Sequence, residues 1–184
     1  MFNREINGGA SPTRTFLSED EASAMFVVIT GVAGSGKTTV GKLLAHDLGW
    51  PFHEGDDFHP AANVEKMRRG EALTDTDRQP WLDALRAMIQ SAVANGESGV
   101  LACSALKRRY REHLRVNDQV VFVHLTATPD LIAHRLQQRK GHFMNSSLLK
   151  SQFATLETAQ SELSLDASLP PAEIINQLRD LLHI

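Results

Sequence analysis

The sequence predicts an α/β fold in which a parallel sheet of about five strands lies between two layers of helices. Short apolar runs alternate with helical patterns along residues 25–184, and a glycine-rich loop joins the first run to the first helix. A chain of 184 residues with 42% hydrophobic content suits a single core. We therefore expect one domain over residues 25–184, preceded by a flexible polar tail over residues 1–24.

The glycine-rich loop carries the most specific signal. Residues 31–38, GVAGSGKT, fill every position of the P-loop pattern. The apolar, β-branched run at residues 25–30 is typical of a buried strand, and apolar residues recur at helical spacing over residues 39–48. Backbone N–H groups and a helix N-terminus at such a loop hold a nucleotide triphosphate. This context favours a P-loop NTPase type of fold over a degenerate loop kept only as a turn.

The motif also predicts what its residues do. Lys37 is expected to contact the β- and γ-phosphates of ATP, and Thr38 is expected to ligate Mg²⁺. The residues expected to bind the nucleotide within the motif are Gly31, Gly34, Ser35, Gly36, Lys37, Thr38 and Thr39.

The later elements are predicted from short apolar runs, helical periodicity and their stop signals. Gly70 is expected to end a polar helix, and Asn95-Gly96 to end the next one. The predicted strands are residues 50–53, 99–102 and 119–125; the predicted helices are residues 61–69, 77–95, 107–115, 130–139 and 171–182. Ligands in such folds bind beyond the carboxyl ends of the strands, where the P-loop and the polar clusters lie.

The composition argues against several classes of function. A formal net charge of −3 and a pI near 6.2 lack the basic surplus of most nucleic-acid binders, so no nucleic-acid partner is expected. No apolar run is long enough to span a membrane, and no signal peptide is evident, so a cytoplasmic location is expected. The single cysteine, Cys103, lies in an apolar run and is expected to be buried and unreactive. The eight histidines show no zinc-binding spacing.

An acidic pair, Asp56-Asp57, follows the second predicted strand. An acceptor hydroxyl needs a carboxylate to orient it, and Mg²⁺ needs carboxylates nearby, usually through water. Paired carboxylates are also common in ordinary loops, and position alone leaves both interpretations open.

Two groups of cations are candidates for binding anions. Arg135 and Arg139 share one helix face because they are four residues apart, which suits a lid that closes over phosphates. A solvated face paired with carboxylates is the competing interpretation. Residues 107–111 hold four cations just after a strand end.

Longer signatures resemble those of the gluconokinases, small P-loop kinases of the nucleoside-monophosphate-kinase-like fold that the shikimate kinases also have. The resemblance covers residues 25–184 in order and rests on DDFHP at 56–60 with Lys66, Asp77-Arg78 and Pro80-Trp81 after it, CSALK at 103–107, RKGHF at 139–143, Gln152-Phe153 and Leu156-Glu157. Glu54, Ala72 and Thr74 stand where this family commonly has aspartate, proline and asparagine.

The resemblance implies ATP-dependent phosphorylation of D-gluconate at its terminal hydroxyl, giving 6-phospho-D-gluconate. It implies Lys37, Asp56, Arg135 and Arg139 as catalytic residues, with Asp56 orienting the hydroxyl and the two arginines clamping phosphates. The acceptor-binding residues that it implies are Asp56, His59, Lys66, Arg78, Lys107 and His142. It further implies a mobile helix at 61–69 over the acceptor, a lid at 140–147 over ATP, adenine near residues 166–170, and a homodimer.

Two alternatives remain at this stage. The acceptor could be another small sugar acid or a polyol such as shikimate. From a different class, the chain could be a nucleotide-gated regulatory protein that phosphorylates no acceptor. The location of the polar clusters at strand ends argues for the kinase.

Overall fold

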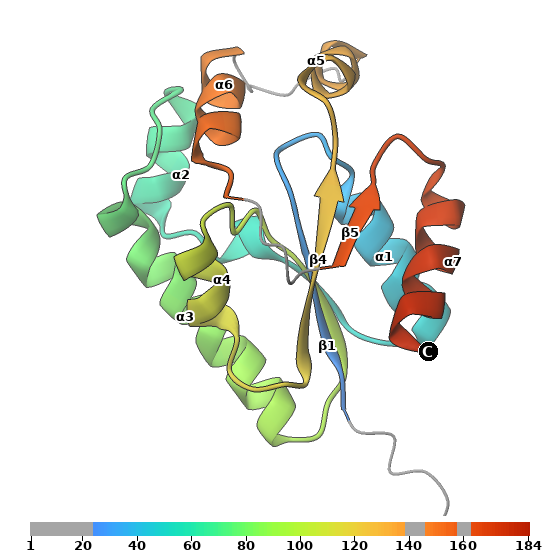
Figure 1. Ribbon diagram of the computed structural model, residues 1–184. Helices are drawn as coiled ribbons and strands as arrows, with labels where there is room; N and C mark the ends of the chain where they lie inside the picture. The colour runs from blue at the N-terminus through green and yellow to red at the C-terminus, as the bar shows by residue number, and fades with distance from the viewer. Residues whose placement is uncertain (1–23, 139–145, 158–162) are drawn as a thin grey trace, which may run out of the picture.

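A five-stranded parallel sheet forms the centre of the molecule (Figure 1). The computed structural model describes residues 24–138, 146–157 and 163–184. The strands are β1 (Phe26–Thr30), β2 (Phe52–Glu54), β3 (Gly99–Ala102), β4 (Val120–Thr126) and β5 (Leu163–Asp166), in the spatial order β2-β3-β1-β4-β5. The predicted fold class is confirmed. The tail expected over residues 1–24 lies, apart from Ala24, outside the described residues.

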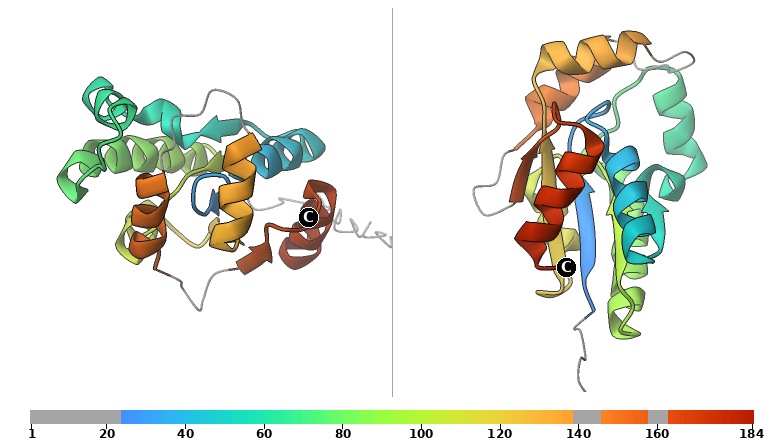
Figure 2. Two further views of the ribbon diagram at one scale, coloured as in Figure 1. Left: turned by 90° about the horizontal axis from the view of Figure 1, so that it is seen from above. Right: turned by 90° about the vertical axis from the view of Figure 1, so that its right-hand side faces the viewer.

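Helices cover both faces of the sheet (Figure 1, Figure 2). The helices are α1 (Lys37–Leu48), the 3₁₀ turn η1 (Gly55–Phe58), α2 (Ala61–Arg68), α3 (Asp75–Ala94), α4 (Arg108–Leu114), α5 (Pro129–Gln138), α6 (Ser146–Thr155) and α7 (Pro171–Leu182). Helices α1 and α7 pack on one face, and α3 and α4 on the other. Helices α5 and α6 lie over the carboxyl edge of the sheet (Figure 2).

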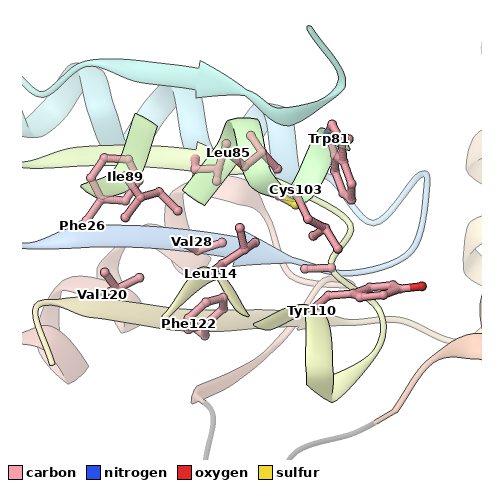
Figure 3. Close-up of a cluster of buried hydrophobic side chains, with 13 residues drawn as sticks. Phe26, Val28, Trp81, Leu85, Ile89, Cys103, Tyr110, Leu114, Val120 and Phe122 are labelled. Atoms are coloured by element: carbon pink, nitrogen blue, oxygen red, sulfur yellow. The ribbon is translucent and has the colours of Figure 1, made fainter. Parts of the chain in front are cut away.

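Strand β1 explains why the sequence shows an unbroken apolar run before the P-loop. Phe26 and Val28 pack with α3 and α4, whereas Val27 and Ile29 pack with α1 and α7. Side chains alternate between the two faces of a strand, so a strand covered on both faces is apolar throughout. Figure 3 shows the first of these two clusters, which includes Cys103. Cys103 is buried, as expected, and this burial raises the pKa of its thiol to about 12.

Most predicted boundaries agree within one or two residues. The second strand, predicted at 50–53, is Phe52–Glu54. Helix α3 begins at Asp75 rather than at residue 77, because Thr74 caps it and exchanges hydrogen bonds with Asp77 in a capping box. The sequence assigned no helix to residues 146–155 and counted a fifth strand without placing it. Within the described residues, no helix is long and apolar enough to cross a membrane.

Candidate active site

The P-loop connects β1 to α1 at the carboxyl edge of the sheet. Gly31 has φ 145°, and a Cβ there would lie 2.8 Å from Ser35 Oγ and 2.9 Å from the backbone oxygen of Leu125. Gly36, the residue before α1, has φ 100°, a conformation that favours glycine. Ser35 Oγ is buried and has no hydrogen-bond partner among the described residues. The conformation of the loop therefore requires glycine at positions 31 and 36, and the Ser35 hydroxyl is available to bind a ligand.

The lysine and the threonine of the motif lie in the first turn of α1. Lys37 Nζ donates a hydrogen bond to the backbone oxygen of Val32 at 3.0 Å. Thr38 Oγ1 donates to a carboxylate oxygen of Glu54 at 2.7 Å. Glu54 is the last residue of β2, so a carboxylate from a second strand meets the hydroxyl expected to bind Mg²⁺.

A cavity of about 350 Å³ opens beside the P-loop. Lys37 of α1, Asp56 of η1 and Arg78 of α3 line it, as does His59 after η1. Asp57, next to Asp56, is not among its lining residues. The cavity thus brings together the P-loop lysine and several residues predicted to bind the acceptor. Of the two adjacent aspartates, Asp56 lines it and Asp57 does not.

His59 is held firmly in this cavity wall. Its ring stacks on Trp81 with ring centres 4.5 Å apart and planes 11° from parallel. The indole N–H of Trp81 donates to the backbone oxygen of Gly55 at 2.7 Å, which fixes the tryptophan beneath η1. Burial lowers the pKa of His59; nearby Asp56 opposes that shift and Arg78 adds to it. Near neutral pH, His59 is therefore an uncharged group for hydrogen bonding.

Arg78 joins the cavity wall to the loop before α3. One guanidinium N–H group donates to the backbone oxygen of Leu73 at 2.5 Å. The guanidinium also lies 5.9 Å from the ring centre of Tyr110. A guanidinium has five donors, and these contacts leave donors for an anionic group in the cavity.

Two of the predicted acceptor-binding cations lie outside the cavity lining. Lys66 Nζ is 2.8 Å from a carboxylate oxygen of Asp77, and Lys107 Nζ is 2.9 Å from one of Asp75. Hydrogen bonds from Arg109, Tyr110 and Lys107 lower the pKa of Asp75 well below its usual range. In this arrangement both lysines neutralise carboxylates of α3.

A second cavity, of about 380 Å³, is lined by other residues of the P-loop. Arg135 of α5 lines it and donates to the backbone oxygens of Ala167 at 2.6 Å and Ser35 at 3.4 Å. The remaining lining residues include four of the predicted nucleotide-binding residues and part of the segment expected near adenine: Gly34, Ser35, Gly36, Thr39, Ala167 and Leu169. Arg139 and His142 lie outside the described residues.

Comparison with known proteins agrees with this geometry. A family model described as shikimate kinase matches residues 33–182. The gluconokinase of Gluconobacter oxydans is 55% identical over 133 residues, which cover 72% of this chain and 75% of that one. The gluconokinase of Arabidopsis thaliana is 37% identical over 180 residues, covering 89% of this chain and 95% of its own. The chain belongs to the gluconokinase family.

Solved structures support the same assignment. A gluconokinase from Sinorhizobium meliloti is 40% identical, with a TM-score of 0.77, and the match covers 88% of this chain and 97% of that one. A sugar kinase from Janibacter sp. is 42% identical with a TM-score of 0.82, over 88% and 95% of the two chains. A shikimate kinase from Bacteroides thetaiotaomicron, at 22% identity and a TM-score of 0.60 over 87% and 99%, shares the fold. The predicted kinase activity is confirmed, and the relatives do not favour the regulatory alternative.

Sequence reasoning did not assign a site role to two residues of this gluconokinase-family member. Glu54 was noticed only as a departure from a common aspartate, although its location at a strand end beside the acidic pair was an available signal. Gln152 of α6 lines the first cavity, and its side-chain oxygen accepts a hydrogen bond from the backbone N–H of Ala33 at 2.7 Å. Helix α6 was not predicted, so nothing indicated that Gln152 reaches the P-loop.

Proposed function

We propose that this kinase transfers the γ-phosphoryl group of ATP to the terminal hydroxyl of D-gluconate, giving 6-phospho-D-gluconate. The observation that carries the proposal is the presence of two cavities that share no lining residue and that are both lined by residues of one P-loop. Lys37 lines one, and Arg135 with the loop glycines lines the other. A donor in one cavity and an acceptor in the other suit phosphoryl transfer beside the loop.

The acceptor cavity has the chemistry that a sugar acid requires. Asp56 is the carboxylate proposed to orient the attacking hydroxyl, and it accepts the proton late because the transition state is loose. Arg78 offers N–H donors to the acceptor carboxylate, and neutral His59 offers a hydrogen bond to a hydroxyl. Lys66 and Lys107 would contribute after leaving their aspartates, and His142 stays an expectation from the resemblance.

The nucleotide side combines backbone and side-chain donors. We propose that the loop N–H groups and the buried Ser35 hydroxyl contact the phosphates. The Lys37 ammonium would stay in contact with the γ-phosphoryl group while it is transferred. Arg135 and Arg139 would stabilise negative charge there. The loop after β5, from Asp166, would contact adenine. Closure of α2 and of residues 140–147 would exclude water and limit hydrolysis of ATP.

Hard oxygen donors support a Mg²⁺ site beside the phosphates. The Thr38 hydroxyl and the Glu54 carboxylate meet at 2.7 Å, and such oxygens are the ligands that Mg²⁺ prefers. We propose that Thr38 ligates the cation and that Glu54, with Asp56 or Asp57, holds its water ligands. The bound cation would supply positive charge to the transferring phosphoryl group.

The direct test is ADP formation by the purified protein with and without D-gluconate, in the presence of Mg²⁺. We expect ADP release that depends on D-gluconate and that shikimate and other sugar acids support far less. Lys37→Ala, which removes the phosphate-contacting ammonium, should reduce turnover by roughly a thousandfold while the protein stays folded. ADP release indifferent to every acceptor would instead support the regulatory alternative.

We also propose a homodimer, as the resemblance implies, and the cytoplasmic location expected from the sequence. Light scattering of the purified protein measures its mass in solution, and a mass of one chain would contradict the dimer.

A further inference from the structure

Gln152 connects the P-loop directly to the acceptor cavity. The Ala33 N–H can only donate, so the atom of the carboxamide that faces it at 2.7 Å must be the oxygen. This contact fixes the orientation of the whole amide, because oxygen and nitrogen are attached to the same carbon. Gln152 also lines the cavity that contains Lys37 and Asp56. A side chain that lines this cavity is therefore held through its oxygen by the P-loop, and its NH₂ group remains for a ligand.

Helix α6 is anchored so that this contact is supported on both sides. Leu149 packs in a small apolar cluster with Val32 of the P-loop. Beyond the helix, Glu157 N–H donates to the backbone oxygen of Leu106 at 2.9 Å, and buried Arg111 donates to the Glu157 backbone oxygen at 2.6 Å. Packing and hydrogen bonds thus hold α6 against both the P-loop and the loop after β3. The position of Gln152 is set by the fold rather than by one side-chain contact.

The amide NH₂ has the right chemistry for the acceptor. It carries two donors, and among the residues that the structure describes no hydrogen bond from it is present. Hydroxyl and carboxylate oxygens of a sugar acid accept such bonds. Because the carboxamide is neutral, it can hold an acceptor beside Asp56 without altering the charge of that carboxylate.

We propose that Gln152 is a specificity-determining residue that couples acceptor binding to the P-loop, a role that rests on the proposed gluconate kinase function. Its side-chain oxygen accepts the hydrogen bond from the Ala33 N–H, and its NH₂ group donates to the sugar acid. An acceptor that engages the amide thereby tightens the loop around the nucleotide. Affinities for the two substrates are then linked, and the linkage is reciprocal.

The test compares Gln152→Met, which keeps the length of the side chain but makes neither bond, with the full-length wild-type chain. Calorimetry gives the Kd of D-gluconate with and without a non-hydrolysable ATP analogue. We expect the analogue to tighten D-gluconate binding at least about fivefold in the wild type and by less than about twofold in the variant. The acceptor KM should rise about tenfold or more, with a smaller change in the ATP KM.

Two further variants keep the test decisive. Gln152→Glu can still accept the Ala33 bond but offers no donor, so it should also lose the coupling, and it carries the test if Gln152→Met does not fold. Lys150→Gln is the control on the same helix, because Lys150 of α6 is exposed and does not line the cavity. Its acceptor KM and coupling should equal those of the wild type.

The proposal is overturned if Gln152→Met keeps the wild-type coupling, or if its acceptor KM stays within about twofold of the wild type. It is also overturned if only the ATP KM rises, because Gln152 would then serve the P-loop alone. A lower melting temperature with unchanged coupling would mean a purely structural role. Failure of the wild type to phosphorylate D-gluconate would instead refute the proposed function and is recognised before any variant is measured.

Discussion

The Thr38 hydroxyl donates to the Glu54 carboxylate at 2.7 Å and so ties the first turn of α1 to the end of β2. These residues are 16 positions apart in the chain, Thr38 in the helix that follows the P-loop and Glu54 at the end of the next strand. A hydroxyl and a carboxylate in contact form one oxygen-rich corner beside the expected phosphates. Substitutions of residues at and near this contact test the roles proposed for the residues that bind the cation, the acceptor and the nucleotide.

Glu54→Gln should raise the Mg²⁺ concentration needed for half-maximal activity by about tenfold, because an amide holds the water ligands of a cation less well than a carboxylate does. Titration of Mg²⁺ in the kinase assay measures this change. Glu54→Asp keeps the charge and should retain most of the activity. An unchanged Mg²⁺ requirement in Glu54→Gln would remove Glu54 from the proposed cation site.

Asp56→Asn should lower kcat by about a hundredfold or more and leave the ATP KM nearly unchanged, because the carboxylate is proposed to orient the acceptor hydroxyl rather than to bind the nucleotide. Asp57→Asn, measured at saturating Mg²⁺, is the comparison, since Asp57 is adjacent but does not line the cavity. Steady-state kinetics with both substrates varied will compare them. The larger loss in Asp57→Asn would transfer the acceptor role to that residue.

Arg78 and Arg135 should affect different substrates because they line different cavities. Arg78→Ala is expected to raise the KM of D-gluconate by about tenfold, and Arg135→Ala to raise that of ATP by a similar factor. Each variant serves as the control for the other in the same assay. If Arg78→Ala instead raised the KM of ATP and Arg135→Ala that of D-gluconate, the assignment of the two substrates to the two cavities would have to be exchanged.

His124 should make the folded protein sensitive to acid. It is buried in β4, with Nδ1 at 3.0 Å from the Thr30 hydroxyl, and burial together with the charges of Arg111 and Lys37 lowers its pKa to about 4. The unfolded chain binds this proton near pH 6.5, whereas the folded protein does not bind it until about pH 4. The stabilising contribution is therefore fully present above pH 6.5 and is lost as the pH falls toward 4.

Urea unfolding at pH 7 and at pH 4.5 measures this effect. Between these two values, the free energy of unfolding of the wild type should fall by about 2 kcal/mol more than that of His124→Asn. His53 and His59 also have lowered pKa values, but they are present in both proteins and cancel in the comparison. Equal pH dependence in the two proteins would mean that His124 does not carry the effect.

Much of the fold could be predicted because its signals are local. The P-loop strand, the strand at residues 99–102 and the final helix at residues 171–182 are found where the sequence placed them. Helix α6 was missed because its stability depends on contacts outside itself, such as Leu149 with Val32. Local periodicity carries little information about such a helix.

The candidate site was predictable in part for the same reason. The motif predicted Lys37 and Thr38, which lie where we propose that the nucleotide binds, and the resemblance predicted Asp56, His59 and Arg78, which line one cavity with Lys37. Lys107 was expected to hold the sugar acid, yet its ammonium lies against Asp75, which is 32 residues away in the chain. Ion pairs between distant residues depend on how helices pack, which spacing alone does not report.

The sequence by itself determined the P-loop and the alternation of strands and helices, because both depend on residue types at short, fixed spacings, and its longer signatures resembled those of the kinase family. Only the tertiary structure decided that Asp56 rather than Asp57 lines the cavity, that Glu54 meets Thr38, and that Gln152 reaches Ala33. These contacts arise where strand ends and an overlying helix converge in space. Residues far apart in the chain become neighbours there, and nothing in their local sequence specifies the partner.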